Sequence, residues 1–312
     1  MPNLANFHYT DRINRAIDYV TKNLAEPLSL EDVANVACFS TFHFHRIFRA
    51  QTGETLAQFI KRLRLERAVY LLSHRPGTSL TQVALACGFS SSSDFSRSFR
   101  SHFGIPPRMF DVALHRGIRR EEMAATLATS AGPSESVQSI QALATPGIDN
   151  PDGFAVRFRD VPARRVAYVR VHNPYAGGGV LRATQTMLTW ARERGLAEGQ
   201  WLGYQWDDPE IVALDRCRYD VGVEIPDGVV VDGEVSVTEL APMKLAEVDV
   251  AGSIDLELSA LHWLYRRWLP TSGFAPDHQP CFEAWNGEPF AHGSTHFELR
   301  IQLAVVDLRI PL

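Results

Sequence analysis

The chain has 312 residues, 45% of them hydrophobic and 21% charged, which is enough for two domains that each bury a core and excludes disorder, collagen or coiled coil as the main architecture. The net charge of −5 is uneven, because residues 1–120 carry 16 basic and 9 acidic side chains whereas the remainder carries 15 and 27. This asymmetry indicates a half that binds a polyanion joined to a half with another task.

The hydropathy and the spacing of His and Cys residues indicate neither a membrane-spanning protein nor a metal-binding one. No run of about 18 apolar residues occurs, and the start, MPNLANFHYTDR, lacks the basic and apolar run of a signal peptide. We expect a cytoplasmic protein with no membrane partner. His43 and His45 are two apart, so on a helix they point to nearly opposite sides. The cysteines form no CxxC pair and are interpreted as small buried side chains, so neither a disulfide nor a metal or other cofactor is expected: Cys38, Cys87, Cys217 and Cys281.

The chain changes character near residues 120 and 153. Before residue 120, apolar residues recur every three or four positions, as in short helices. The next segment is rich in Ala, Ser, Thr, Pro and Gly, which is typical of a linker, although part of it could be a frayed helix. Alternating, β-branched runs follow, with helix-like stretches near 178–194 and 255–268. We predict an all-α domain over 1–120, a linker over 121–152 and an α+β domain with mainly antiparallel strands over 153–312.

The basic half contains a repeat. LSLEDVA at 28–34 is matched by TSLTQVA at 78–84, and each copy has the Ser-x-x-acid/amide spacing that caps the first turn of a helix. A CFS turn and a GFS turn follow, whose serines, Ser40 and Ser90, are predicted to cap second helices. Helix, short turn and helix, twice, indicates two helix-turn-helix units.

The second helix of each unit has an apolar face and a polar face. At an offset of 51, Gly53 and Gly104 match as helix stops. The polar faces are predicted to contact DNA through Phe42, His45, Arg46 and Arg49 in the first helix and Ser93, Ser96, Arg97 and Arg100 in the second. Arg can hold a guanine bidentately or clamp a phosphate, Ser and His make shorter contacts, and Phe can touch a thymine methyl. Arginines on one isolated helix are more often merely solvated, but the repeated caps and glycines favour two DNA-reading helices.

Residues 55–73 predict one continuous helix between the two units. Nineteen residues at about 1.5 Å each span about 28 Å, close to the roughly 34 Å between successive major-groove openings on one face of DNA. One chain is therefore expected to occupy two adjacent grooves.

Two segments, PLSLEDVANVACFSTFHFHRIFRAQTG and SLTQVALACGFSSSSDFSRSFRSHFGIPP, resemble the helix-turn-helix signatures of the AraC/XylS family of transcription regulators. The resemblance covers roughly residues 9–116. It implies double-stranded DNA and RNA polymerase as partners. It also implies base-contacting positions at Phe42, His45, Arg46, Ser92, Ser93 and Arg97. Relatives often carry Trp or Gln where this chain has Phe42, His45 and two serines, so the preferred DNA sequence does not carry over.

The acidic half also repeats, at an offset of 80. VPARRVA at 161–167 is answered by APMKLAE at 241–247, and Gly203-Tyr204 corresponds to Cys281-Phe282. Two pseudo-symmetric strand-helix-strand-strand repeats are predicted, with a ligand cleft at their axis.

Aromatic residues gather where the repeats predict that cleft. The predicted ligand-binding residues are Glu283, Trp285, Tyr204 and Trp206. An ionised carboxylate among rings is costly unless a cationic or donor-rich ligand matches it. Alternatively, Glu283 is a strand residue that faces water or a structural arginine.

WLGYQWDDP, WLPTSGF and FEAW resemble GyrI-like effector-binding domains over residues 154–312. The resemblance implies that Glu283 lies in a small-molecule pocket, although relatives commonly have Tyr where this chain has Trp285. Some GyrI-like proteins are hydrolases, so Glu283 could act as a general base on water; a protein-docking domain is the other alternative. No nucleophile triad or metal cluster supports an enzyme, and no catalytic residue is predicted. The three glycines at 177–179 lack the Lys-Ser/Thr of a phosphate loop and are interpreted as a turn.

Overall fold

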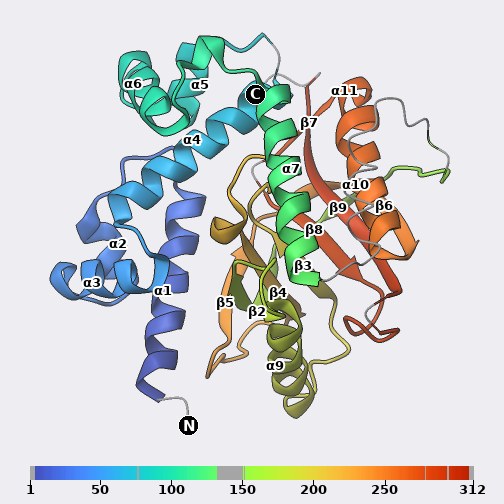
Figure 1. The fold of residues 1–312 in the computed structure, drawn as a ribbon. Coiled ribbons are helices and arrows are strands. Elements are labelled where there is room, and N and C mark those ends of the chain that lie inside the picture. Colours follow the sequence, from blue (N-terminus) through green and yellow to red (C-terminus); the bar gives the residue numbers. More distant parts are fainter. Residues whose placement is uncertain are drawn as a thin grey trace. The chain divides into compact units, whose positions relative to one another are not determined.

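The computed structural model describes residues 4–75, 77–131, 150, 152–277, 279–293 and 295–308 (Figure 1). The chain forms two compact units: residues 1–115 with 231–238, and residues 116–230 with 239–312. The first is mainly helical and the second holds an antiparallel sheet, so the predicted two-domain fold class is confirmed. Among the described residues, no helix is long and apolar enough to cross a membrane.

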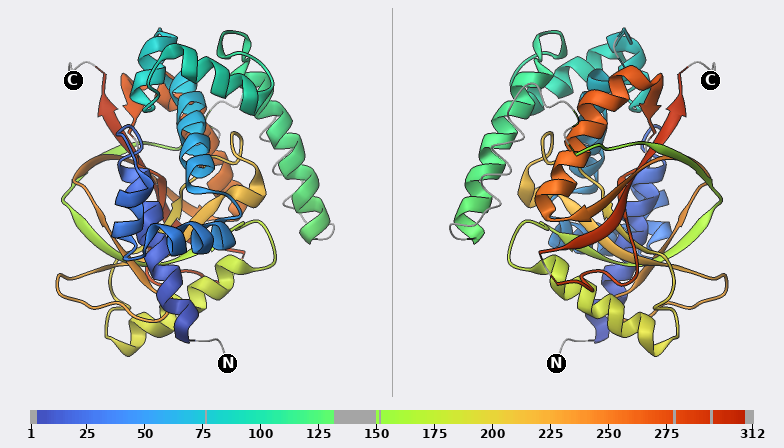
Figure 2. Two further views of the ribbon diagram at one scale, coloured as in Figure 1. Left: turned by 90° about the vertical axis from the view of Figure 1, so that its left-hand side faces the viewer. Right: turned by 90° about the vertical axis from the view of Figure 1, so that its right-hand side faces the viewer.

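The first unit is built from short helices around one longer helix. Their bounds are α1 (Leu4–Lys22), α2 (Leu30–Val36), α3 (Thr41–Thr52), α4 (Leu56–His74), α5 (Leu80–Ala86), α6 (Ser92–Phe103) and the 3-10 turn η1 (Pro107–Met109). The predicted connecting helix is α4, capped by Thr55 and Gln58 in a reciprocal capping box. Helices α3 and α6 lie toward opposite ends of α4 (Figure 1, Figure 2).

Both helix-turn-helix units pack around pairs of phenylalanines. Phe44 and Phe48 on α3 are fully buried, and Phe48 meets Phe59 on α4 with ring centroids 5.4 Å apart. Phe95 and Phe99 on α6 are equally buried, with their centroids also 5.4 Å apart. The aromatic positions of the two units therefore match at the predicted offset of 51.

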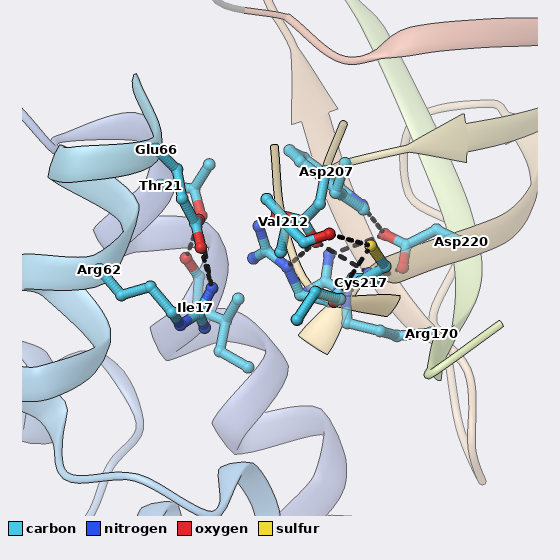
Figure 3. A network of polar contacts seen from close by, with 12 residues as sticks. Ile17, Thr21, Arg62, Glu66, Arg170, Asp207, Val212, Cys217 and Asp220 are labelled. Atoms are coloured by element: carbon cyan, nitrogen blue, oxygen red, sulfur yellow. Dashed lines mark hydrogen bonds and ion pairs between the residues drawn. The ribbon is translucent and has the colours of Figure 1, made fainter. Parts of the chain in front are cut away.

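A buried ion-pair cluster fastens the start of α4. Arg62 is buried and donates to Glu54 Oε1 at 2.6 Å. It also donates to Glu66 Oε1 at 3.0 Å (Figure 3). Two carboxylates thus compensate one guanidinium, which avoids the cost of an unpaired buried charge. On α1, the Thr21 hydroxyl donates to the Ile17 carbonyl at 2.8 Å (Figure 3).

The predicted linker begins inside a helix. Helix α7 (Val112–Ala131) includes residues 121–131, because EEMAATLATSA is rich in helix formers and holds neither Gly nor Pro. On α7, Arg116 donates to Asp208 at 2.8 Å and to Glu210 at 2.7 Å, within the second unit. The division between the units therefore falls at residue 115, before the predicted end of the first domain, and the rest of the predicted linker lies almost entirely outside the described residues.

The second unit consists of strands with two main helical segments. Besides residues 116–131 of α7, its elements are β1 (Arg157–Val161), β2 (Arg164–His172), α9 (Gly179–Glu193), β3 (Trp201–Gln205), η2 (Leu214–Arg216), β4 (Arg218–Ile225), β5 (Ser236–Leu240), β6 (Met243–Gly252), α10 (Ile254–Trp263), the π-helical turn η3 (Leu264–Trp268), α11 (Leu269–Ser272), β7 (Phe274–Pro276), β8 (Cys281–Trp285) and β9 (Phe297–Asp307). Residues 236–238 of β5 belong to the first unit.

The sheet order shows the internal repeat. The strands run β1-β6-β9-β8-β3-β4-β2-β5, with β7 beside β9. Exchanging β1 with β5, β2 with β6, β3 with β8 and β4 with β9 returns the same order reversed, so the pseudo-two-fold axis lies between β3 and β8. Each repeat has one strand more than predicted, since β1 crosses over to pair with β6 of the other repeat.

One face of the sheet carries Glu283. In β8, Glu283 and Trp285 point to that face and Phe282 to the other, because side chains alternate along a strand. Helices α9 and α10 contact equivalent strand pairs, β2 with β4 and β6 with β9. Both helices cover the Glu283 face. Helix α10 supplies Glu257, which hydrogen-bonds Glu283. Gly179, the first residue of α9, lies close to Val171, which pairs with Tyr219 and shares its face, and Tyr219 hydrogen-bonds Glu283.

Candidate functional site

The first candidate reading helix is α3. The Ser40 hydroxyl accepts from the His43 backbone N–H at 3.4 Å, and Gly53 ends the helix at φ 76° with its N–H donated to the Arg49 carbonyl. These caps fix the helix ends without using the polar face. That face is exposed: it carries Phe42, with 63% of its surface accessible, together with His45, Arg46 and Arg49.

The second candidate reading helix is α6. Its N-cap is Ser91, whose hydroxyl accepts from the Asp94 N–H at 3.1 Å, so the prediction of Ser90 as the cap is wrong. The second unit has one more residue in its turn, which moves the cap from an offset of 50 to 51. Gly104 ends α6 at φ 80°, as Gly53 ends α3. Of the predicted contacts, Ser93, Arg97 and Arg100 are exposed and Ser92 and Ser96 are half-buried.

The arginines of both helices are available to a ligand. Within the described residues, no carboxylate forms an ion pair with those of the reading faces, which are Arg46, Arg49, Arg97 and Arg100. The Arg46 guanidinium lies 4.9 Å from the centroid of the Phe42 ring. Stacking on a ring restricts that guanidinium while leaving its N–H groups able to donate.

The two helix-turn-helix units are held together inside the first domain. Arg64 on α4 donates to the Leu24 carbonyl at 3.0 Å and to the Glu26 carbonyl at 2.8 Å, in the α1–α2 connection. The turn of the second unit touches the same connection: a Cβ on Gly88 would lie 2.7 Å from the Leu24 carbonyl oxygen. These contacts fix α3 and α6 relative to each other.

The second candidate site surrounds Glu283 on β8. Glu283 is buried, and its carboxylate accepts from the Gln205 amide at 2.7 Å and from the Tyr219 hydroxyl at 2.5 Å. Gly203 lies opposite Glu283 across β3 and β8, and a Cβ there would lie only 2.0 Å from the Tyr219 hydroxyl. Glycine at this position is therefore what lets the phenol reach the carboxylate.

A second buried carboxyl meets Glu283. Glu257 on α10 is buried and hydrogen-bonds Glu283. Burial, the charge of Glu283 and this hydrogen bond together raise the pKa of Glu257 well above its usual range. Burial also raises the pKa of Glu283, although the hydrogen bonds from Tyr219 and Gln205 oppose that rise. These pKa directions are those of a pair of interacting carboxyls in which one keeps its proton to a higher pH than an isolated glutamate does.

The predicted aromatic surroundings of Glu283 need correction. Trp285 lies on the Glu283 face, and its side chain hydrogen-bonds Tyr219. Tyr204 points to the opposite face, where its ring packs 5.1 Å from that of Phe282 in an apolar cluster. Trp206 packs against the same cluster.

Trp206 is part of a polar network on that opposite face. Its indole N–H donates to Asp220 at 2.6 Å. Arg170 donates to both oxygens of the same carboxylate at 2.7 and 2.8 Å, and Figure 3 labels Arg170 and Asp220. Nearby, Arg218 donates to both oxygens of Asp207 at 2.7 and 2.8 Å. These contacts give Trp206 a structural role.

Sequence reasoning missed Gln205, Tyr219 and Glu257 at this site. Gly203, a glycine inside a strand, was the available signal for a close approach there. No comparable signal marked Glu257. Among the described residues, no group of three or more His, Cys, Asp and Glu side chains could hold a metal ion.

Comparisons with known proteins agree with both domains. A helix-turn-helix domain family matches residues 33–111, and the GyrI-like small molecule binding domain family matches residues 154–306. The chain is 30% identical over 110 residues to the multiple antibiotic resistance protein MarA of Salmonella typhimurium, covering 35% of this chain and 84% of MarA. The chain belongs to the AraC-type family of transcription regulators. In this member the helix-turn-helix domain precedes a GyrI-like domain.

Other matches concern the first domain. The chain is 32% identical over 118 residues to the uncharacterized HTH-type transcriptional regulator YbfP of Bacillus subtilis, covering 37% of this chain and 39% of YbfP. Of the solved structures, the DNA-binding domain of AdpA in complex with a target DNA is 28% identical, covers 36% of this chain and 96% of its own, and has a TM-score of 0.30. The chain thus matches less than half the length of YbfP.

Proposed function

We propose that this AraC-type regulator binds double-stranded DNA through α3 and α6 of one chain, in two successive major grooves. The observation that carries the proposal is the repeated pair of capped helices that expose arginines without ion-pair partners among the described residues. Phosphate contacts by Arg and Lys would give affinity that falls steeply with salt through counterion release. Contact with RNA polymerase, which the family resemblance implies, stays a prediction.

The length of α4 supports binding in two grooves. Its 19 residues span about 28 Å at 1.5 Å per residue, and Arg64 and Gly88 tie the second unit to the α1–α2 connection. A rigid pair of unlike helices needs no second chain to read a site without symmetry.

Selection of binding sites from random-sequence DNA by the full chain tests this proposal. The selected DNA should contain two unlike half-sites about one helical turn apart. As a control, the Arg46→Ala/Arg97→Ala double variant should enrich no sequence. Failure of the wild-type chain to enrich any sequence would contradict the proposal.

For the second domain, we propose a small, cationic aromatic ligand bound at Glu283. The support is a buried carboxylate that, in the described part of the chain, has no Lys, Arg or His as an ion-pair partner. Trp285 lies on the same face and can add cation–π attraction. Tyr219 and Gln205 hold the carboxylate in place by hydrogen bonds.

Titration calorimetry with a graded set of probes tests the ligand class. Mono-methylated bipyridinium carries one positive charge on the ring system of neutral bipyridine. Glu283→Gln keeps the shape and removes the charge, so the affinity for the monocation should fall at least about tenfold while that for bipyridine changes little. Glu247→Gln, at a buried carboxyl that accepts from Gln302, is the matched control and should leave both affinities unchanged.

Equal losses for the cation and for bipyridine would show a structural role for Glu283 and favour a protein-docking domain. Conversion of a probe to product by the wild-type chain but not by Glu283→Gln would instead favour the hydrolase alternative.

A further inference from the structure

Glu257 is the group in the Glu283 site that the cation proposal does not use. It lies on α10 (Ile254–Trp263), and its side chain reaches Glu283 on β8 of the same repeat. Its side chain is buried and hydrogen-bonds Glu283. Two carboxyls in such contact cannot both ionise without strong repulsion, so one proton stays between them.

We propose that Glu257 and Glu283 form a proton-exchanging pair in which a dicationic ligand displaces the shared proton, so that Glu257 sets the preference for dications over monocations. This inference rests on the proposed cation site. With the proton in place the pair carries one negative charge, which matches a monocation. When a dication binds, the Glu257 O–H bond breaks, the proton leaves to solvent, and both carboxylates face the ligand.

The negative charge of the site comes from Glu257 and Glu283, because the titratable groups around them are neutral near pH 7. The titratable side chains near it come from β4, β8, η3 and the loop after β2: Tyr219, Cys281, Tyr265 and Tyr175. Burial raises the pKa of Tyr219, Cys281 and Tyr175, so each is neutral near pH 7. In the described part of the chain, no Lys, Arg or His forms an ion pair with either carboxyl. A second positive charge on the ligand would therefore be balanced by deprotonating Glu257.

Hydrogen bonds hold the Glu283 side chain in place, which favours loss of the shared proton over a movement of the side chain when a dication binds. Glu283 is held by Tyr219 at 2.5 Å and Gln205 at 2.7 Å, so it cannot turn away from Glu257 without losing both donors. An unmet buried carboxylate is costly. Ionising Glu257 against a bound cation leaves the hydrogen bonds from Tyr219 and Gln205 to Glu283 in place.

Methyl viologen, the dication, and mono-methylated bipyridinium, the monocation, are the probes for this inference. Calorimetry of the full chain in two buffers with different ionisation enthalpies gives the number of protons released. We expect wild type to release up to one proton with methyl viologen and none with the monocation. The affinity for methyl viologen should rise with pH by up to about tenfold per unit until the shared proton is lost in the free protein, because binding releases that proton; monocation affinity should stay flat.

Glu257→Gln reproduces the protonated side chain and removes its ability to ionise. It should abolish proton release and reduce the preference for methyl viologen by about tenfold or more, while keeping the wild-type affinity for the monocation. Independently of any ligand, carboxyl carbon NMR of wild type should show one glutamate that titrates well above the usual range of that side chain and is absent from Glu257→Gln. The double variant Glu257→Gln/Glu283→Gln should lose at least about tenfold in affinity for both cations.

The outcomes separate the two proposals. Methyl viologen binding without proton release, or equal dication preference in wild type and Glu257→Gln, would overturn the role of Glu257 and leave the cation site intact. The absence of a glutamate that titrates above its usual range would overturn it as well. Failure of wild type to bind either cation would overturn the cation site itself, and this inference with it.

Discussion

The two helix-turn-helix units agree where they pack and differ where they face outward. Phe44 and Phe95 are buried to the same extent at matching positions, and a left-handed glycine ends each second helix. On the exposed faces, the Arg46 guanidinium lies near the Phe42 ring, whereas the residue four positions before the corresponding Arg97 is Ser93, which offers no ring. Packing and capping constrain the buried positions alike, whereas the exposed positions differ between the two units.

The turns of the two units show the same contrast. Gly88 adopts φ 80° against the Leu24 and Ala25 carbonyl oxygens, where a side chain has no room. The corresponding turn of the first unit has Cys38 at φ 52°, exposed to solvent. A left-handed backbone is required in both turns. The first turn contacts α1 through Arg12, which donates to the Ala37 carbonyl, whereas at Gly88 the backbone of another segment leaves no room for a Cβ.

Breaking the turn of the second unit should give the largest effect on stability. Gly88→Ala places a Cβ 2.7 Å from a backbone oxygen in a left-handed conformation, and we expect a loss of about 3 kcal/mol in the free energy of unfolding. Gly104→Ala has the same backbone requirement but nothing within 4 Å, so it should cost about 1 kcal/mol. Urea unfolding followed by helical circular dichroism measures both. Equal losses would show that the wedge does not matter.

Removing one arginine from each reading face sharpens the comparison of DNA contacts. Arg46→Ala and Arg97→Ala should each cost about 1 to 3 kcal/mol on the selected site and less on random DNA, if they read bases. Each change should relax discrimination in a different half of the site. Quantitative binding to a set of single-base variants measures this. If both changes relax the same base pairs, the alignment of the two units at an offset of 51 is wrong.

The smallest expected effect is a gain at the first turn. Cys38→Gly removes the strain of a side chain at φ 52° and should raise the free energy of unfolding by about 0.5 to 1 kcal/mol, after allowing for the greater freedom of glycine in the unfolded chain. Cys38→Ser keeps the Cβ and serves as the control, with little change expected. A loss of stability in Cys38→Gly, measured by urea unfolding, would mean that the thiol makes a contact worth more than the strain.

Local physics explains which features could be predicted. Caps, helix stops and amphipathic faces depend on residues within a few positions of one another, so α3, α4 and α6 were accessible from sequence apart from the Ser90/Ser91 shift. The strand faces were accessible in principle, since the repeat already aligns Tyr204 with Phe282 rather than with Glu283. The contact between Glu257 and Glu283 was not, because it depends on how α10 lies on the sheet.

Hydroxyl-radical footprinting of the full chain on its selected DNA tests most directly that one chain reads two adjacent grooves. Two protected windows on one face of the duplex, about one helical turn apart and complete at a stoichiometry of one chain per site, are predicted. Protection of a single groove would contradict the account. So would a requirement for an inverted repeat that binds only two chains together.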